Sequence, residues 1–146
     1  RECLYALDAE FKRLQRIGER TTSTLAFLDL DKFKQVNDQY GHQTGDKALL
    51  VITERIKSTM RANDLVGRYG GDEFLLLLKD TRDYEAQHLI DRIFMEPLIV
   101  RGECGEEILI QCSIGMSEWH QELENVQQWI EEADRQMYHV KGNKAS

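Results

Sequence analysis

The stretch "RYGGDEFLLLLKD", residues 68–80, decides the fold of this chain. Its second half, Phe74–Leu78, is an unbroken apolar run, which is typical of a strand that is buried on both faces. The segment 64–70 also has strand character, so the glycine pair between the two segments predicts a hairpin with a two-residue turn. Two adjacent acids, Asp72 and Glu73, then stand at the entrance of a central strand. Acids in that position need a counter-charge.

Apolar residues at spacings of three and four predict helices on either side of this hairpin. The helices are expected over residues 2–17, 32–41, 46–60, 83–96 and 125–140, with Asp46 as the N-cap of the third. Strands are expected over 24–31, 97–102 and 106–119, with a Gly-Glu-Cys-Gly turn between the last two. This order alternates but is rich in hairpins, so it predicts a fold of the α/β (α+β) class with helices packed on a mixed sheet.

The composition limits the classes of protein to which the chain can belong. Its 146 residues suit one domain with a real core, and its longest apolar run is far too short to span a bilayer. A formal net charge of −7 argues against nucleic acid as a partner, and no membrane contact is expected from this segment. The three cysteines have no Cys-x-x-Cys spacing, which favours a cytoplasmic location over disulfides or structural zinc.

A second pair of acids ends the strand predicted over 24–31. Residues two apart in a strand share a face, so Asp29 and Asp31 are expected to point the same way. If this strand end meets Asp72 and Glu73, the carboxylates form an oxygen-rich pocket that suits Mg²⁺ or Mn²⁺ with phosphates. Acids near turns are also commonly just solvated. The buried strand that begins at Asp72 and Glu73 favours the metal interpretation.

The segment "GHQTGDKA", residues 41–48, has the glycines and the lysine of a phosphate-binding loop. It lacks the Gly-Lys-Ser/Thr sequence and the spacing of that loop, and the carboxylate of Asp46 would repel a phosphate there. Two interpretations of Asp46 stay open. It caps the helix, or it accepts hydrogen bonds from a base that carries N–H donors, such as the guanine edge.

Four motifs in combination resemble the GGDEF-domain diguanylate cyclases. They are "GGDEF" at 70–74, "DLDKFKQVND" at 29–38, "YGHQTGD" at 40–46 and "RAND" at 61–64, and the resemblance covers essentially the whole chain. It implies a palm-like domain with a mostly antiparallel central sheet flanked by helices. It also implies an enzyme that condenses two GTP molecules into cyclic di-GMP and releases two pyrophosphates.

The resemblance also implies roles for individual residues. Two metal ions, Mg²⁺ or Mn²⁺, are expected in each half-site, held by Asp29, Asp72, Glu73 and the backbone carbonyl of Leu30. The catalytic set is Asp29, Asp72 and Glu73, with Glu73 also implied in activating the 3′-hydroxyl. The implied substrate-binding residues are Asn37 and Asp46 at guanine, Lys34 and Lys141 at the triphosphate, and Phe33, Leu49, Gly70 and Gly71 around the nucleotide. The spacing of Leu49 equally fits a residue of the helix core.

The partners follow from the same resemblance. Each domain is implied to hold one GTP, so a homodimer with two facing sites is expected for catalysis. "RAND" matches an Arg-x-x-Asp motif, which implies that Arg61 and Asp64 bind cyclic di-GMP as an inhibitory product. Taken alone, this tetrapeptide also fits the polar end of a helix whose dipole favours an arginine. The alternative function is a non-catalytic module that binds GTP or cyclic di-GMP, against which the intact acids Asp72 and Glu73 argue.

Two departures from the family pattern concern the ends of the chain. The opening segment of the family is missing, so residues 1–146 are expected to be a single catalytic domain, trimmed at its N-terminus from a longer chain with an upstream sensor. The last helix reads "KGNK" from Lys141, where the family pattern is Lys-x-x-Gly-Arg-Asn. Lys144 can replace that arginine only as a point charge, not as a bidentate donor.

Overall fold

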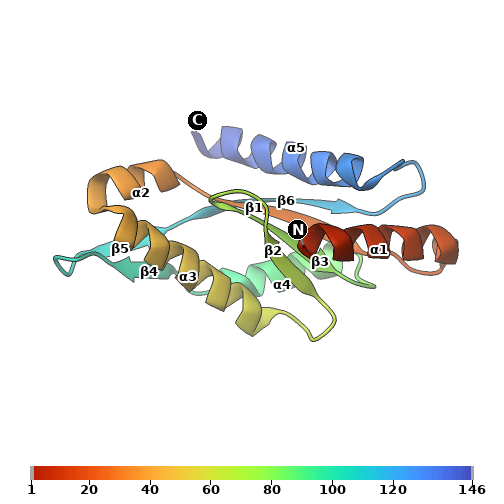
Figure 1. Cartoon of the computed structure of the whole chain (residues 1–146), viewed down its shortest axis with the longest axis horizontal. Coiled ribbons are helices and arrows are strands. Elements are labelled where there is room, and N and C mark those ends of the chain that lie inside the picture. The colour runs from red at the N-terminus through yellow and green to blue at the C-terminus, as the bar shows by residue number, and fades with distance from the viewer. Residues whose placement is uncertain (1, 146) are drawn as a thin grey trace.

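The computed structural model describes residues 2–145, apart from the side chains of residues 2, 19 and 138–145. In chain order the elements are α1 (Glu2–Ile17), the 3₁₀ helix η1 (Gly18–Arg20), β1 (Thr24–Leu30), α2 (Phe33–Tyr40), α3 (His42–Thr59), β2 (Leu65–Arg68), β3 (Glu73–Leu78), α4 (Asp83–Ile93), β4 (Leu98–Arg101), β5 (Glu107–Ile110), β6 (Cys112–Glu118) and α5 (Val126–Ala145) (Figure 1). Within this part of the chain, every helix is too short or too polar to cross a membrane.

A four-stranded sheet in the order β2-β3-β1-β6 forms the centre of the molecule, and its strand pairs are all antiparallel. Strands β4 and β5 pair with each other in a separate antiparallel hairpin. The run Phe74–Leu78 is buried along its whole length in β3, which lies inside the sheet between β2 and β1. The predicted class, helices on a mostly antiparallel sheet, is therefore confirmed.

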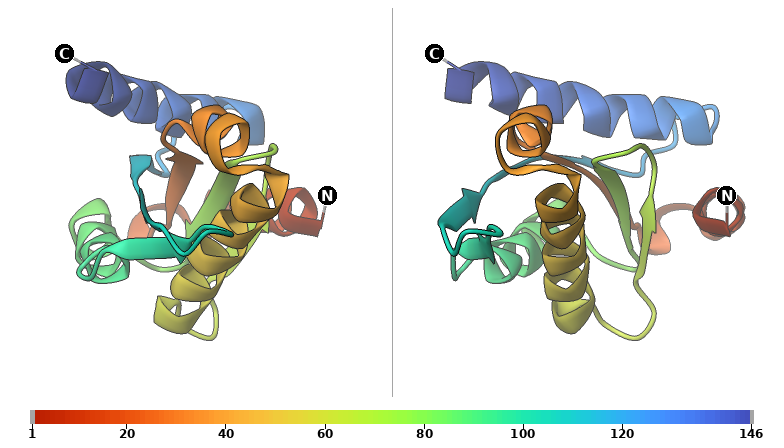
Figure 2. Two further views of the ribbon diagram at one scale, coloured as in Figure 1. Left: turned by 90° about the vertical axis from the view of Figure 1, so that its left-hand side faces the viewer. Right: turned by 60° about the vertical axis from the view of Figure 1, so that its left-hand side comes forward.

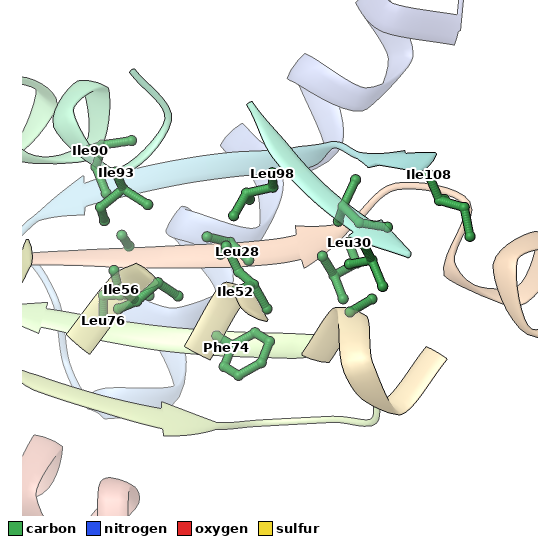
Figure 3. Packing of buried hydrophobic residues seen from close by; sticks show 14 residues of the cluster. Leu28, Leu30, Ile52, Ile56, Phe74, Leu76, Ile90, Ile93, Leu98 and Ile108 are labelled. Atoms are coloured by element: carbon green, nitrogen blue, oxygen red, sulfur yellow. The ribbon is translucent and has the colours of Figure 1, made fainter. Parts of the chain in front are cut away.

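Alternate residues of β1 and β3 point to opposite faces of the sheet, and each face has its own hydrophobic core. On the face that we call the α5 face, side chains of α1 and α5 pack on Leu25, Phe27, Leu75 and Leu77. On the opposite face, which we call the α3 face, side chains of α3, α4 and the β4–β5 hairpin pack on Ala26, Leu28, Leu30, Phe74 and Leu76 (Figure 3). Figure 2 shows α5 and α3 on opposite sides of the sheet.

The turn between β2 and β3 is longer than the sequence predicted. The strands end at Arg68 and begin again at Glu73, so four residues connect them and the prediction of a two-residue turn is wrong. The Glu73 carbonyl accepts the N–H groups of both Tyr69 (2.8 Å) and Gly70 (3.4 Å). The Arg68 guanidinium also donates to the carbonyl of Gly71. These bonds close a wider loop that a two-residue turn would not allow.

The helix expected to start at Asp46 starts four residues earlier, at His42. Gly41 is the residue between α2 and α3, and its φ of 92° is a conformation that glycine adopts at little cost. Its N–H closes α2 on the Asn37 carbonyl (2.9 Å), and its own carbonyl accepts the Gly45 N–H (3.2 Å) as α3 begins. The prediction that Asp46 is the N-cap is therefore wrong, and Asp46 is an exposed residue inside α3.

The strand expected over 106–119 divides at Gln111 into two strands that belong to different sheets. The carbonyl of Gln111 accepts the N–H of Asp31 (2.8 Å), at the point where β1 ends. With this bond the chain leaves β4 and joins β1. This switch places the first residues of β6 beside the acids of β1.

Candidate active site

Asp29 and Glu73 are direct neighbours across the sheet. Asp29 is the second-last residue of β1 and Glu73 the first of β3, and the two are register partners. Because Leu30 donates its N–H to the carbonyl of Asp72 (3.2 Å), the alternation of an antiparallel ladder makes Asp29 and Glu73 a non-hydrogen-bonded pair, whose side chains approach closely. Both point to the α5 face, since Phe27 and Leu75 do. Asp29 is only 8% exposed.

Gly70 makes room for the Glu73 carboxylate. A Cβ added at Gly70 would overlap Glu73 Oε1, whereas one added at Gly71 would meet no atom within 4 Å. The loop is held on the α5 face by Tyr69, whose ring packs edge-on against Phe27 with 5.5 Å between ring centroids. Gly70 therefore leaves the space that the Glu73 carboxylate occupies, whereas the space beside the backbone of Gly71 is open.

Asp72 and Leu30 complete the group of oxygen donors at this sheet end. Asp72 is half-buried in the loop just before β3. The N–H of Leu30 points at the carbonyl of Asp72, and the N–H and C=O of a strand residue point to the same side of the strand. The Leu30 carbonyl therefore also points toward the Asp72 loop. Carboxylate and carbonyl oxygens are the ligands that Mg²⁺ and Mn²⁺ prefer, so this donor set fits a divalent cation.

The acids are not gathered into one tight cage. Among the described side chains, no three or more His, Cys, Asp or Glu residues are grouped so as to hold a metal ion. The closest pairing that the register shows is Asp29 with Glu73, with Asp72 contributed by the loop. A cation at this position would therefore complete its coordination with oxygens from outside the chain, as Mg²⁺ does with nucleotide phosphates.

Asp31, the residue after β1, is directed toward β6, on the side of β1 opposite to β3. Its Oδ1 accepts a hydrogen bond from Ser113 Oγ (2.6 Å), and Ser113 lies on β6 as the register partner of Asp29. Ser113 is completely buried. Sequence reasoning missed Ser113. Its signal was the alternation of small residues at Ser113, Gly115 and Ser117, but only the register with β1 shows that it meets the acids.

The residues expected at guanine lie on the two helices that follow β1. A Cβ added at Gly45 would overlap the amide oxygen of Asn37, so the Asn37 side chain of α2 rests directly on the α3 backbone next to Asp46. Phe33 lies in the same helix junction, since its ring edge would be 3.4 Å from that Cβ. The structure thus brings Asn37 and Asp46 together at one junction, and Asp46 is exposed there.

The remaining substrate-binding predictions fall on residues in three different settings. Leu49 is half-buried and packs against the core of the α3 face, which agrees with its spacing on the helix. Phe33 also packs against that core. Lys34 is exposed on α2, one turn before Asn37. Lys141 lies in α5, but its side chain is outside the described residues.

The second predicted site, Arg61 with Asp64, lies at the other end of β3. Asp64 is almost fully buried and accepts two bonds from the Arg61 guanidinium, from Nε (2.8 Å) and from Nη2 (3.0 Å). These bonds raise the pKa of Arg61. Nη2 also donates to the carbonyl of Lys79 (3.3 Å) and to the Thr81 hydroxyl. Among the described residues, Nη1 makes no further hydrogen bond to the protein.

A pocket of about 260 Å³ opens beside this guanidinium. It is lined by Arg61, Thr81, Glu85, His88, Leu89 and Arg92. Arg92 belongs to α4, so two guanidinium groups from different elements face one hollow. Such an arrangement suits an anionic ligand, because guanidinium groups form planar, charge-assisted hydrogen bonds to phosphates.

With this geometry established, the comparisons with known proteins identify the family. Residues 4–146 match the family model described as diguanylate cyclase, GGDEF domain. The match covers nearly the whole chain, and it includes both the hairpin acids and the Arg-x-x-Asp segment. The chain therefore belongs to the GGDEF diguanylate cyclase family.

Individual relatives agree with this assignment. The chain is 35% identical over 127 residues to Diguanylate cyclase A of Treponema denticola, an alignment that covers 86% of this chain and 34% of that protein. Its fold is similar to that of diguanylate cyclase SiaD of Pseudomonas aeruginosa, solved in complex with its activator SiaC (TM-score 0.89, 38% identity, 97% of this chain and 54% of that one). It is also similar to the GGDEF domain of DgcB from Caulobacter crescentus in complex with c-di-GMP (TM-score 0.87, 28% identity, 95% and 82% coverage).

The chain spans only part of the curated relatives that it matches. It covers 32% of the probable diguanylate cyclase DgcC of Escherichia coli and 34% of the Treponema protein.

Proposed function

We propose that this chain is an active diguanylate cyclase, which joins two GTP molecules into cyclic di-GMP and releases two pyrophosphates. The observation that carries the proposal is the pairing of Asp29 with Glu73 at one sheet end, with Asp72 and the Leu30 carbonyl beside it. Two like charges directly opposite each other destabilise a sheet. Carboxylate and carbonyl oxygens gathered in this way are the donors that a divalent cation prefers, and family membership supplies the substrate class.

We expect Asp29, Asp72, Glu73 and the Leu30 carbonyl to hold two divalent cations, Mg²⁺ or Mn²⁺. When bound, the cations would offset the charge of the triphosphate and make the 3′-hydroxyl of ribose a better nucleophile. Glu73 has a second role in this proposal. Its carboxylate lies against Gly70, and in this proposal it takes the proton of the attacking hydroxyl as a general base.

The guanine base is assigned to the junction of α2 and α3. Asn37 and Asp46 meet there across Gly45, and Asp46 can accept from the N–H donors of guanine. Adenine presents no such donors at that edge. We propose that Lys34, which is exposed on α2, meets the triphosphate, and we propose the same role for Lys141 from the family resemblance.

Catalysis requires two domains, because each holds one GTP and the product contains two newly formed phosphodiester bonds. We therefore propose a homodimer in which two such sites face each other across a two-fold axis. We also propose that cyclic di-GMP binds at Arg61 and Asp64 and inhibits the enzyme. The pocket shared by Arg61 and Arg92 supports this second site.

The test is to incubate the purified protein with GTP and Mg²⁺ and to identify the product by mass. Cyclic di-GMP should form, and its rate per protein molecule should fall when the protein is diluted through the range where dimers separate. Asp72→Asn and Glu73→Gln should each lower turnover at least 100-fold. Both should leave the free energy of unfolding within about 1 kcal/mol of wild type, since they remove charge and no core volume.

The variants also separate the enzyme from a binding module. A wild-type protein that binds GTP without forming cyclic di-GMP would contradict the enzyme and favour a non-catalytic GGDEF module. Normal turnover by both Asp72→Asn and Glu73→Gln would contradict the assignment of the acids to the cations. Asp91→Asn, an exposed acid on α4, is the matched control for loss of one carboxylate charge.

A further inference from the structure

Ser113 is a buried polar residue whose partners lie in the candidate active site. It is completely buried near the start of β6 and is the register partner of Asp29. Its hydroxyl donates to Asp31 Oδ1 over 2.6 Å. Ser113 thus contacts both acids of the Asp-x-Asp motif: it pairs with Asp29 through the strand ladder and with Asp31 through its side chain.

The direction of this bond matters because β1 lies between β3 and β6. Glu73 belongs to β3 and Ser113 to β6, so they flank β1 on opposite sides. The Ser113 hydroxyl therefore holds the Asp31 carboxylate on the side of β1 that faces away from Glu73. The bond thus directs a third carboxylate away from the Asp29–Glu73 pair, where like charges already meet.

The same bond restrains the backbone that leads into α2. Asp31 is held twice at β6, by its side chain on Ser113 and by its N–H on the Gln111 carbonyl (2.8 Å). The next residue, Lys32, has a φ of 56°, a left-handed conformation that costs a side-chain-bearing residue free energy. Such a conformation persists only where the surrounding structure fixes it. The two bonds of Asp31 to β6 fix the backbone directly before Lys32.

We propose that Ser113 is a positioning residue of the cyclase site: it keeps Asp31 out of the cation-binding group and fixes the turn at Asp31 and Lys32, from which α2 presents Lys34 and Asn37 to the nucleotide. The consequence for nucleotide binding rests on the proposed function. The restraint on the turn does not, because it concerns contacts within the chain.

Three variants isolate the hydroxyl. Ser113→Ala removes it, Ser113→Thr retains it, and Ser117→Ala is the matched control. Ser117 is also buried on the same face of β6, four residues further along, and its hydroxyl donates to Glu132 of α5 (3.3 Å). Because Ser113 has no exposed surface, the threonine can overpack. Ser113→Ala is therefore also made in an Asp31→Ala background, where the bond is already absent.

The first measurement is amide hydrogen exchange of residues 31–34 without nucleotide. Ser113→Ala should speed this exchange about tenfold or more, and Ser117→Ala should leave it unchanged. The second is affinity for the α,β-methylene analogue of GTP, which cannot lose pyrophosphate, in the presence of Mg²⁺. Ser113→Ala should weaken it about 10- to 100-fold, the range for losing a group that lies just outside the ligands of a metal site. The Asp31→Ala background should abolish the effect of Ser113→Ala.

The outcomes separate the two proposals. Wild-type protein that binds the analogue, together with a Ser113→Ala variant of equal affinity and unchanged exchange, would overturn the role of Ser113 and leave the cyclase proposal standing. Wild-type protein without affinity for the analogue would overturn the cyclase proposal, while the exchange experiment still decides whether Ser113 fixes the turn. Equal losses in Ser113→Ala and Ser117→Ala would show a general effect of β6 packing and would also overturn the positioning role.

Discussion

At the scale of single residues, the loop between β2 and β3 depends on the close approach of the Glu73 carboxylate to Gly70. Glu73 is the first residue of β3, and its carboxylate lies where a side chain on Gly70 would have to be. The Glu73 backbone carbonyl meanwhile accepts two loop N–H groups, so the backbone of this residue is fixed while its carboxylate is steered by the glycine. The position of the carboxylate therefore depends on the absence of one methyl group.

Gly70→Ala should lower turnover about tenfold or more with little loss of stability. The new Cβ would overlap Glu73 Oε1, which is the end of a flexible side chain and can rotate away cheaply. The carboxylate would then leave the place opposite Asp29. The free energy of unfolding should fall by less than about 1 kcal/mol, because no core atom moves. Denaturant unfolding and the GTP turnover assay measure the two effects.

Gly71→Ala is the comparison, because a Cβ there would meet no protein atom within 4 Å. It tests whether any methyl group on the loop is enough to lower turnover. A smaller loss than in Gly70→Ala is expected. Wild-type turnover in Gly70→Ala would show that the Glu73 carboxylate does not need its place over the glycine.

At the scale of elements, helix α1 is attached to the sheet by a buried charge as well as by its apolar face. Glu10 is 3% exposed and accepts two bonds from Arg13, at 2.6 and 2.8 Å, and one from the Ser23 hydroxyl. Arg13 also reaches Asp80 (2.8 Å), just beyond β3. The two carboxylates raise the pKa of Arg13. One arginine of α1 thus connects the helix to the end of the sheet opposite the candidate active site.

Arg13→Met should reduce the free energy of unfolding by about 2–4 kcal/mol. The methionine keeps most of the aliphatic volume but leaves the buried Glu10 carboxylate without its counter-charge, and breaking such a pair from one side is costly. Much of that cost should be recovered in the double variant with Glu10→Gln, which removes the uncompensated charge. Denaturant unfolding of the single and double variants gives both numbers.

Lys12→Met is the matched control on the same helix. Lys12 pairs with Asp8 at 3.1 Å, but both side chains are more than half exposed, at 64% and 53%. Loss of an exposed pair of this kind costs about 0.5 kcal/mol or less. Equal destabilisation by Lys12→Met and Arg13→Met would contradict the view that the buried carboxylate anchors α1.

At the scale of the whole molecule, the two candidate sites lie at opposite ends of β3. Glu73 begins the strand, and Arg61 and Asp64 bond to the backbone of Lys79, directly after its end. A strand of six residues is about 20 Å long, so a ligand on Arg61 does not reach the acids of its own domain. Any inhibition from that end is transmitted along β3 or acts by joining two domains in a non-productive arrangement.

Arg61→Ala should therefore relieve inhibition by cyclic di-GMP and leave the initial rate within about twofold of wild type. The lost guanidinium is one of the two that line the pocket, while Asp72 and Glu73 are untouched. Progress curves with and without added cyclic di-GMP measure the effect. The variant should also be less stable by about 1–3 kcal/mol, because the buried Asp64 carboxylate loses its charged partner and keeps only two backbone donors, the N–H groups of residue 61 (3.0 Å) and Lys79 (3.3 Å).

Arg92→Ala provides a second test that leaves the Asp64 pair intact, since Arg92 lines the same pocket from α4. It should weaken inhibition as well. Arg101→Ala is the control for loss of one positive charge, because Arg101 is highly exposed on the β4–β5 hairpin. If wild type, Arg61→Ala and Arg92→Ala slow equally as product accumulates, the inhibitory site lies elsewhere or does not exist.

Much of the fold was predictable because local patterns and the global structure agree. The apolar run of β3 needed burial on both faces, and the spacing of Leu7, Phe11 and Leu14 needed a helix with one apolar side. Two predicted boundaries failed where a backbone hydrogen bond, in one case from a distant segment, decided them. One strand ends just before Gln111 because the Gln111 carbonyl accepts the N–H of Asp31. Helix α3 begins directly after Gly41 because the N–H of Gly41 closes α2 while its carbonyl accepts an N–H from the first turn of α3.

The sequence by itself determined which acids, glycines and basic residues the chain carries, and their spacing was enough to indicate the family. Only the tertiary structure decided which of them meet. The register of β1 with β3 sets Asp29 against Glu73, and its register with β6 turns Asp31 toward Ser113. The physical reason is that spacing along a strand fixes the face of a residue, while its neighbour across the sheet depends on backbone hydrogen bonds between segments far apart in the chain.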